Sequence, residues 1–149
     1  MFIFNLDLSV INFQLEKVIT FTFQLSIFNL NSSLIQIKSR DFAIRIVNCY
    51  KFLTEQKHEM VMSKQLLRCG TSIGANTRES KNAQSRTDFL SKLNIALKEA
   101  DETEYWLDLL HETKYIDDKQ FESLLSDCKE LIAILVAIIK KLKETTKLK

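Results

Sequence analysis

Five basic residues in the middle of the chain have the spacing of a nucleic-acid contact. Lys64, Arg68, Arg78 and Lys81 are separated by four, ten and three residues, so they lie along one side of a helix, and Arg86 follows just beyond. Positive side chains in such a row can follow a phosphate backbone. The sequence therefore predicts a basic ridge, made of these five residues, that binds RNA or DNA. A mobile basic tail would extend it, through Lys140, Lys141, Lys143, Lys147 and Lys149.

A second interpretation of the basic ridge is contact between subunits. Acidic residues at spacings of three, four and four form a counterpart further along the chain, namely Asp101, Glu104, Asp108 and Glu112. In an assembly, the basic ridge of one copy would meet this acidic ridge of a neighbour and set the subunit orientation. The formal net charge of +2 is too small to indicate a nucleic-acid binder by itself.

Carboxylates close to the basic ridge are candidates for acid–base chemistry. Glu99 and Glu102 together with Glu79 could form a carboxylate pair, but the chain offers no third catalytic group, no phosphate loop and no Cys-x-x-Cys motif. Hydrogen bonding to Asn76 or Tyr105 in a buried polar core is the preferred interpretation. We therefore predict that these five residues are structural and that the protein is not an enzyme.

Two sequence pairs have the form of a metal site. Helical bundles hold di-iron centres with carboxylates and Glu-x-x-His pairs, and Glu55-x-x-His58 and Asp108-x-x-His111 resemble such pairs. The first pair falls in an expected connection, and Asp108 belongs to the acidic ridge. The two pairs are therefore not expected to face one centre, and we predict neither metal nor cofactor.

The elements that position these residues are predicted to be helices. The chain has 149 residues, no proline and only two glycines, which disfavours folds that need frequent turns. Apolar residues repeat at helical spacing in four segments, at about 39–55, about 58–83, from Ser85 and from Asp117. Ser85 with Asp88, and Asp117 with Gln120, have the form of capping boxes. Short connections between long helices predict an all-α, antiparallel up-down-up-down four-helix bundle.

The three cysteines fit the same pattern. Cys49, Cys69 and Cys128 are odd in number, far apart and at positions where an apolar helical residue would fit. We interpret them as reduced core residues of a cytoplasmic protein.

Gly70 and Gly74 are one helical turn apart within the second predicted helix. Each glycine costs a helix about 1 kcal/mol relative to alanine, so the pair indicates a benefit from removing side chains. Together with neighbouring small residues they predict a surface that another helix can approach closely.

The last predicted helix contains the segment LIAILVAII, residues 131–139, which is apolar around its whole circumference. It is too short to cross a membrane, so protein must bury it on more than one side. One bundle core covers a single stripe of each helix, which predicts a homo-oligomer. The predicted interface consists of Leu131, Ile132, Ile134, Leu135, Ile138 and Ile139. The alternative is a thick core that the N-terminal segment covers.

Residues 1–38 differ from the rest and are treated as an N-terminal extension to a bundle domain at 39–149. They hold six of the ten phenylalanines and few charges, and their apolar residues alternate, as in Ile19, Phe21 and Phe23. Period two is typical of strands, so the extension is predicted to be a β-hairpin or disordered. A membrane helix at 18–37 is disfavoured because polar residues occupy about half of it. In another interpretation, translation starts downstream at a non-Met codon and this extension is not part of the native protein.

Several motifs in the bundle domain resemble a known family. They stand in the family's order and spacing, namely Ser63-Lys64-Gln65-Leu66, Ser72-Ile73-Gly74-Ala75-Asn76, Glu79, Phe89, Lys98-Glu99-Ala100 and Glu104-Tyr105-Trp106-Leu107. On these residues the chain resembles the bacterial four-helix bundle family of the 23S rRNA intervening-sequence proteins. More distantly, it resembles the accessory variability determinants of diversity-generating retroelements. The resemblance covers about residues 40–140. Cys69 departs from the more usual serine or alanine.

This resemblance implies a left-handed four-helix bundle that assembles into a homopentameric ring without established enzymatic activity. It also implies RNA or a reverse transcriptase as a partner. A purely structural protein–protein interaction module remains the alternative function.

Overall fold

The computed structural model describes residues 8–146 of the chain, and in this range all regular secondary structure is helical. The helices are α1 (Leu8–Glu55), α2 (Met62–Ser80), α3 (Arg86–Glu112) and α4 (Asp118–Thr146). The prediction of an all-α protein is therefore confirmed for the described residues.

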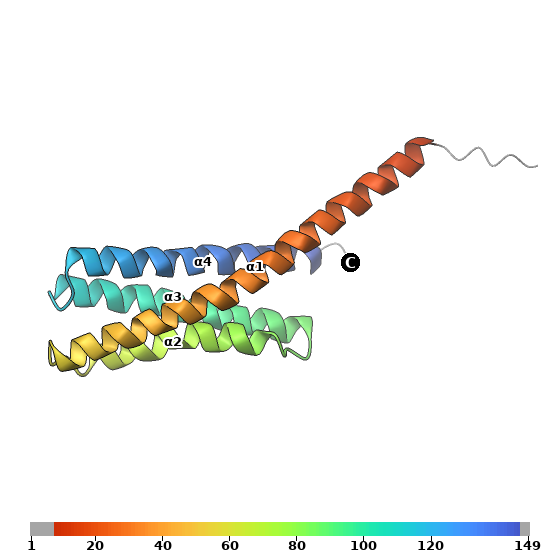
Figure 1. Cartoon of the computed structure of the whole chain (residues 1–149). Helices are drawn as coiled ribbons and strands as arrows, with labels where there is room; N and C mark the ends of the chain where they lie inside the picture. Colours follow the sequence, from red (N-terminus) through yellow and green to blue (C-terminus); the bar gives the residue numbers. More distant parts are fainter. Residues whose placement is uncertain (1–7, 147–149) are drawn as a thin grey trace, which may run out of the picture.

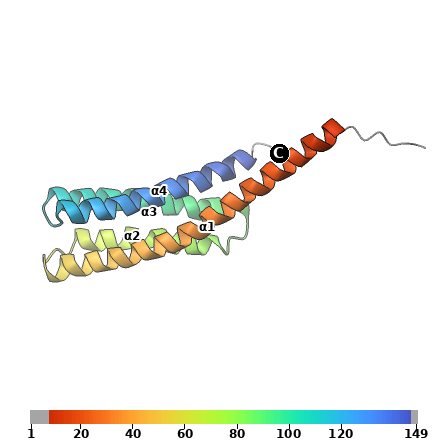
Figure 2. The ribbon, with the colours of Figure 1, turned by 45° about the horizontal axis from the view of Figure 1, so that its top comes forward.

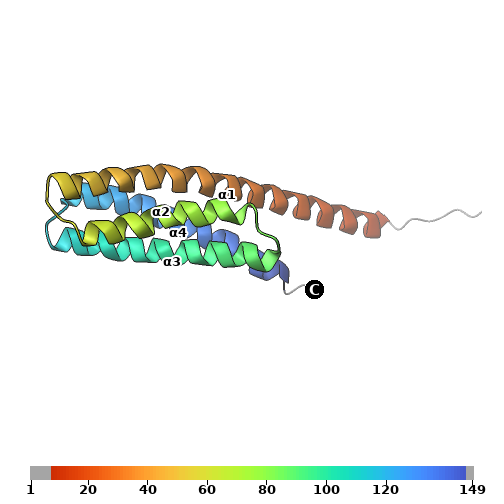
Figure 3. The ribbon, with the colours of Figure 1, turned by 90° about the horizontal axis from the view of Figure 1, so that it is seen from below.

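The four helices lie side by side as a helical bundle, and consecutive helices run in opposite directions (Figures 1 and 3). Packing contacts join α1 to α2, α2 to α3, α3 to α4 and α4 back to α1. Because the turns between helices are short, each helix packs beside the one that precedes it.

The N-terminal half of α1 corrects the prediction of a β-hairpin or a disordered extension. From Leu8 onward the chain is helical and runs without a break past residue 38, so the expected domain boundary falls inside α1. A hairpin would leave two strand edges that nothing else in the described chain could pair, whereas a helix satisfies its backbone groups locally. The period-two pattern therefore predicted the wrong secondary structure for the described part of the extension, residues 8–38. Among the described residues, no helix meets the length and hydrophobicity needed to cross a membrane.

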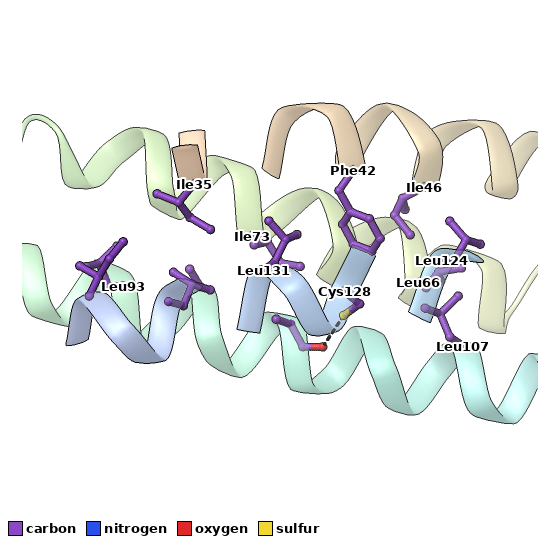
Figure 4. Packing of buried hydrophobic residues seen from close by; sticks show 14 of the residues in the cluster. Ile35, Phe42, Ile46, Leu66, Ile73, Leu93, Leu107, Leu124, Cys128 and Leu131 are labelled. Atoms are coloured by element: carbon purple, nitrogen blue, oxygen red, sulfur yellow. Dashed lines mark hydrogen bonds between the residues drawn. The ribbon is translucent and has the colours of Figure 1, made fainter. Parts of the chain in front are cut away.

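The core takes one apolar stripe from each helix (Figure 4). Ile35, Phe42 and Ile46 of α1 face Ile73 of α2 and Leu131 of α4, and all five are at most 2% exposed. The thiol of Cys128 also lies in this core and donates to the carbonyl of Ala100 at 3.3 Å, as the dashed line in Figure 4 shows.

Gly70 and Gly74 allow α1 and α2 to approach closely. A Cβ at position 70 would lie 2.8 Å from Cγ1 of Ile46, and one at position 74 would lie 3.3 Å from the carbonyl oxygen of Ser39. The predicted close approach of another helix is confirmed, and that helix is α1.

Both predicted capping boxes are present in whole or in part. The Ser85 hydroxyl accepts from the backbone N–H of Asp88 at 3.0 Å, and α3 begins there. At the start of α4, Asp117 accepts from the N–H of Gln120 at 2.8 Å, and the Gln120 side chain accepts from the N–H of Asp117 at 3.0 Å. These bonds satisfy backbone donors that a helix start leaves without partners.

Replacing Asp117 with alanine is expected to lower the free energy of unfolding by about 1 kcal/mol, because one of these donors loses its acceptor. Urea titration followed by circular dichroism measures the change. Asp108→Ala is the matched control, since Asp108 is exposed in the middle of α3 and caps no helix. Equal effects of the two substitutions would contradict the capping role.

Candidate nucleic-acid and assembly surfaces

The basic ridge is only partly free to bind another molecule. Lys64 and Arg78 are exposed on the outer face of α2, and neither forms an ion pair with any described residue. Arg68 is different, because its guanidinium contacts the carboxylate of Glu102 and lies 3.5 Å from that of Glu99, both on α3. The hydrogen bond from Arg68, and then that from the Trp106 ring, lowers the pKa of Glu102. Arg68 therefore joins α2 to α3 of its own chain.

The last two members of the basic ridge lie at one end of the bundle. Lys81 follows the last residue of α2, and Arg86 begins α3. The Arg86 guanidinium donates to the carbonyl of Leu142 near the end of α4 at 2.5 Å. Lys140 and Lys143, predicted as part of a mobile tail, are instead exposed residues within helix α4. Lys147 and Lys149 lie outside the described residues.

We call Lys81, Arg86, Lys140 and Lys143 the basic end. All four are exposed, and the contact between Arg86 and Leu142 shows that the start of α3 and the end of α4 adjoin. Sequence reasoning assigned all four to one basic surface but placed the lysines of α4 on a mobile tail, because they lie more than fifty residues from Arg86 in the chain. Lysines near the end of α4 also match the partial negative charge of a helix C-terminus.

The acidic counterpart lies on α3, where Asp101, Asp108 and Glu112 are exposed. The fourth member, Glu104, is 3.7 Å from the ammonium group of Lys129 on α4. This residue pairs with a neighbouring helix of the same chain. Contact of this acidic ridge with another subunit stays a prediction.

The residues predicted to form a buried polar core occupy different positions. Asn76 donates to the carbonyl of Ser72 in its own helix at 2.9 Å, and Glu79 is at the surface, 2.5 Å from Lys92. Glu99 and Glu102 are half-buried partners of Arg68, and Tyr105 is 58% exposed. The burial expected for Glu79 and Tyr105 is therefore wrong within the single chain. Both side chains lie at the surface of the bundle, where Glu79 pairs with a lysine of α3 and the Tyr105 ring lies edge-on to Trp106 of its own helix, with 5.1 Å between ring centroids.

One cluster of small polar groups inside the bundle lies between α1 and α2. The hydroxyls of Ser39 and Thr77 are 3.0 Å apart, and the amide of Gln36 donates to the carbonyl of Thr77. Both hydroxyl-bearing residues are at most 1% exposed. Sequence spacing carried a signal, because Ser39 stands one turn from Ile35 and from Phe42 on the apolar stripe of α1.

The predicted oligomer interface on α4 needs correction. Leu131, Leu135, Ile138 and Ile139 are at most 6% exposed, so they belong to the core of the chain itself, while Ile132 and Ile134 are half-buried. The four buried residues belong to the single apolar stripe of α4, which α1 and α3 of the same chain cover.

The outer face of α4 remains open, and we define it by Ala133, Val136 and Ala137, all exposed. Val136 is 46% exposed. Beside this face lies a groove of about 430 Å³ between α3 and α4, which Leu97, Val136, Ile139 and the two basic-end lysines line.

The two sequence pairs that resembled metal sites are not brought together. Glu55 and His58 are exposed at the turn after α1. The His111 ring stacks on Phe121 with centroids 4.2 Å apart, and its Nε2 lies 2.8 Å from a carboxylate oxygen of Asp118. Within the described part of the chain, no three His, Cys, Asp or Glu side chains cluster in a way that could hold a metal ion.

Comparison with known proteins assigns the chain to a family. The family model described as 23S rRNA-intervening sequence protein matches residues 32–137. The chain belongs to this family. A crystal structure of an S23 ribosomal protein family member from Bacteroides thetaiotaomicron, described as a protein with unknown function, is 58% identical with a TM-score of 0.73. That similarity covers 74% of this chain and 98% of the other. No curated protein matches the chain.

The match to the 23S rRNA-intervening sequence protein family starts inside α1. It includes most of the bundle, the basic ridge up to Arg86 and the outer face of α4, but it excludes residues 8–31 and the last part of α4, residues 138–146. The N-terminal part of α1 is therefore a feature of this 23S rRNA-intervening sequence protein that the family match does not explain.

Proposed function

We propose that this protein is a cytoplasmic, non-enzymatic accessory factor that binds RNA or DNA as an assembly of identical copies. Each subunit is an antiparallel up-down-up-down four-helix bundle, an arrangement that the contacts between successive helices and between α4 and α1 support. The function requires neither a cofactor nor a metal.

The basic end is the observation that carries the nucleic-acid proposal. Lys81, Arg86, Lys140 and Lys143 come from the turn after α2 and from helices α3 and α4, and they lie at one end of the bundle, with Arg78 close by on α2. Two acidic side chains near this end are already engaged, since Asp88 caps α3 and Glu79 pairs with Lys92, while Glu144 is exposed beside Lys143. A phosphate backbone at this end would therefore meet several cations and little opposing charge.

Assembly rests on the outer face of α4 and on the family resemblance. The small side chains of Ala133 and Ala137 beside the exposed Val136 leave room for a helix of a second subunit, and the adjacent groove extends this apolar area. The resemblance implies a homopentameric ring. Such a ring would repeat the basic end around one rim and increase the avidity for a long nucleic acid.

The salt dependence of RNA binding tests the nucleic-acid proposal. For Lys81→Ala/Lys140→Ala, the slope of log K against log salt on single-stranded RNA is expected to become shallower by about 1.4, because two phosphate contacts are lost. Filter binding at several salt concentrations measures it. Lys51→Ala/Lys119→Ala removes the same charge from exposed positions at the opposite end and is the matched control.

Identical slopes for the three proteins would remove the basic end from nucleic-acid binding. Absence of any salt-dependent binding would favour the alternative, a protein–protein interaction module. In that case a reverse transcriptase is the partner to test first, because the family resemblance implies it.

A further inference from the structure

Residues 8–31 of α1, which we call the arm, extend beyond the bundle. Among the described side chains of α1, the first in the core is that of Ile35, and all three views show the N-terminal part of the helix leading away from α2, α3 and α4 (Figures 1, 2 and 3). Between residues 12 and 23 every side chain is exposed. This stretch of the arm therefore has no covering partner within the described chain.

The exposed surface of the arm is unusually apolar. Between residues 12 and 23 the large apolar side chains are between 52% and 66% exposed, and they are Phe13, Leu15, Val18, Ile19, Phe21 and Phe23. Scattered exposed apolar residues are normal, but a continuous set of this size indicates a surface that another molecule covers.

The distribution of these side chains around the helix restricts what can cover them. At 100° per residue, Val18, Ile19 and Phe21 point in different directions, so the arm has no separate polar face. A helix lying on a membrane surface needs a polar face, usually with several lysines or arginines, and the only charges in the arm are Glu16 and Lys17. Burial on several sides is instead what neighbouring helices provide.

Two hydroxyl groups of the arm do not oppose such burial. The Thr22 hydroxyl donates to the carbonyl of Val18 at 2.7 Å, and the Ser26 hydroxyl donates to that of Thr22 at 3.0 Å. Each hydroxyl is thus satisfied within its own helix. The ammonium group of Lys17 lies 4.2 Å from the centroid of the Phe13 ring, which keeps this charge against the arm.

From these observations we propose that the arms of several copies of this chain pack against one another. One Glu and one Lys give each arm no net charge, so identical arms do not repel each other. If neighbouring arms enclose the six apolar side chains, each copy removes on the order of 600 Å² from water, near the amount per partner in specific interfaces. The arm lies outside the family match, so this contact is additional to any ring made by the bundle.

Cross-linking of the full-length chain tests this contact. In Thr20→Cys, a short bis-maleimide is expected to join most chains in pairs at micromolar concentration, and Gln56→Cys, exposed at the other end of the bundle, is the matched control without cross-links. Adding Phe21→Glu/Phe23→Glu to Thr20→Cys is expected to reduce the yield at least tenfold. The wild-type chain gives the background, which is low because burial raises the pKa of Cys49 to about 11 and of Cys128 to about 12.

Equal cross-linking of Thr20→Cys and Gln56→Cys would overturn the proposal. Flotation of the wild-type chain with phosphatidylcholine–phosphatidylglycerol vesicles, without cross-links between arms, would also overturn it and assign the arm to lipid. Light scattering and cross-linking of Thr20→Cys/Val136→Glu distinguish the contact between arms from the proposed ring. If this variant loses the ring but keeps the cross-links between arms, the contact between arms is supported and the ring is a separate contact. If the ring is stable but the arms do not cross-link, the proposed contact between arms is wrong and only the ring stands.

Discussion

Replacing Gly70 with valine is expected to lower the free energy of unfolding by about 3 kcal/mol, because the site has no space for side-chain atoms. A Cβ at this position would already lie 2.8 and 3.0 Å from the two γ-carbons of Ile46. Ile46 is completely buried, so it cannot move aside without disturbing the core between α1 and α2. The gain in helix propensity over glycine is at most about 1 kcal/mol and does not compensate.

Chemical denaturation with a second substitution identifies the cause. Ile46→Ala alone should cost about 2–5 kcal/mol because it leaves a cavity. In the double variant the valine methyl groups occupy part of that space, so Gly70→Val/Ile46→Ala should be more stable than the sum of the single effects by about 2 kcal/mol. Ala75→Val on the exposed face of α2 is the control, with an expected cost of about 0.5 kcal/mol. Strict additivity would contradict the contact.

The second large effect on the free energy of unfolding is expected at Glu59, which stabilises the start of α2. Its carboxylate accepts the backbone N–H groups of Val61 and Met62 at 2.9 Å each and that of Ser63 at 2.6 Å, and the residue is only 6% exposed. These are donors at a helix start, and the negative charge also matches the positive end of the helix dipole. Replacing Glu59 with glutamine is expected to cost about 2–3 kcal/mol at neutral pH.

The pH dependence of this effect follows from the pKa of Glu59. Burial raises the pKa, but the backbone hydrogen bonds from Met62, Ser63 and Val61 together outweigh it, so the pKa lies below the ordinary value of 4.5. A carboxyl group with a lowered pKa in the folded state stabilises fully above its unfolded pKa and loses this contribution as the pH falls through the folded value. The stability difference between wild type and Glu59→Gln should therefore shrink below about pH 4.5.

Urea titrations between pH 3 and pH 7 measure this difference. Glu55→Gln removes an exposed carboxylate at the end of α1 and is the matched control, for which only a small effect is expected. A Glu59→Gln variant as stable as Glu55→Gln at pH 7 would show that the cap contributes little.

Much of the helical bundle was predictable from local pattern, because helices and their caps depend on residues close in sequence. The repeat of Phe42 and Ile46, the capping pairs at Ser85 and Asp117 and the close approach at Gly70 all follow from spacings of three and four residues. The N-terminal extension was the exception. Its alternation suggested strands, yet a strand needs a partner that the rest of the chain does not offer.

The candidate surfaces were less predictable, since they depend on which helices meet. Spacing alone placed Arg68 in the basic ridge, but only packing decided that α3 brings Glu102 against its guanidinium. Likewise, an apolar circumference at residues 131–139 indicated burial on several sides without telling whether the same chain or another copy supplies the cover.

By itself, the sequence determined that the bundle region consists of helices, where α3 and α4 begin and which stripe of each helix is apolar, because these properties arise within a few residues of the chain. Tertiary structure alone decided that Leu135 and Ile138 are core, that Arg86 adjoins the end of α4 and that the arm stands clear of the bundle. The physical reason is that burial and charge pairing are set by the other helices that a side chain meets in space.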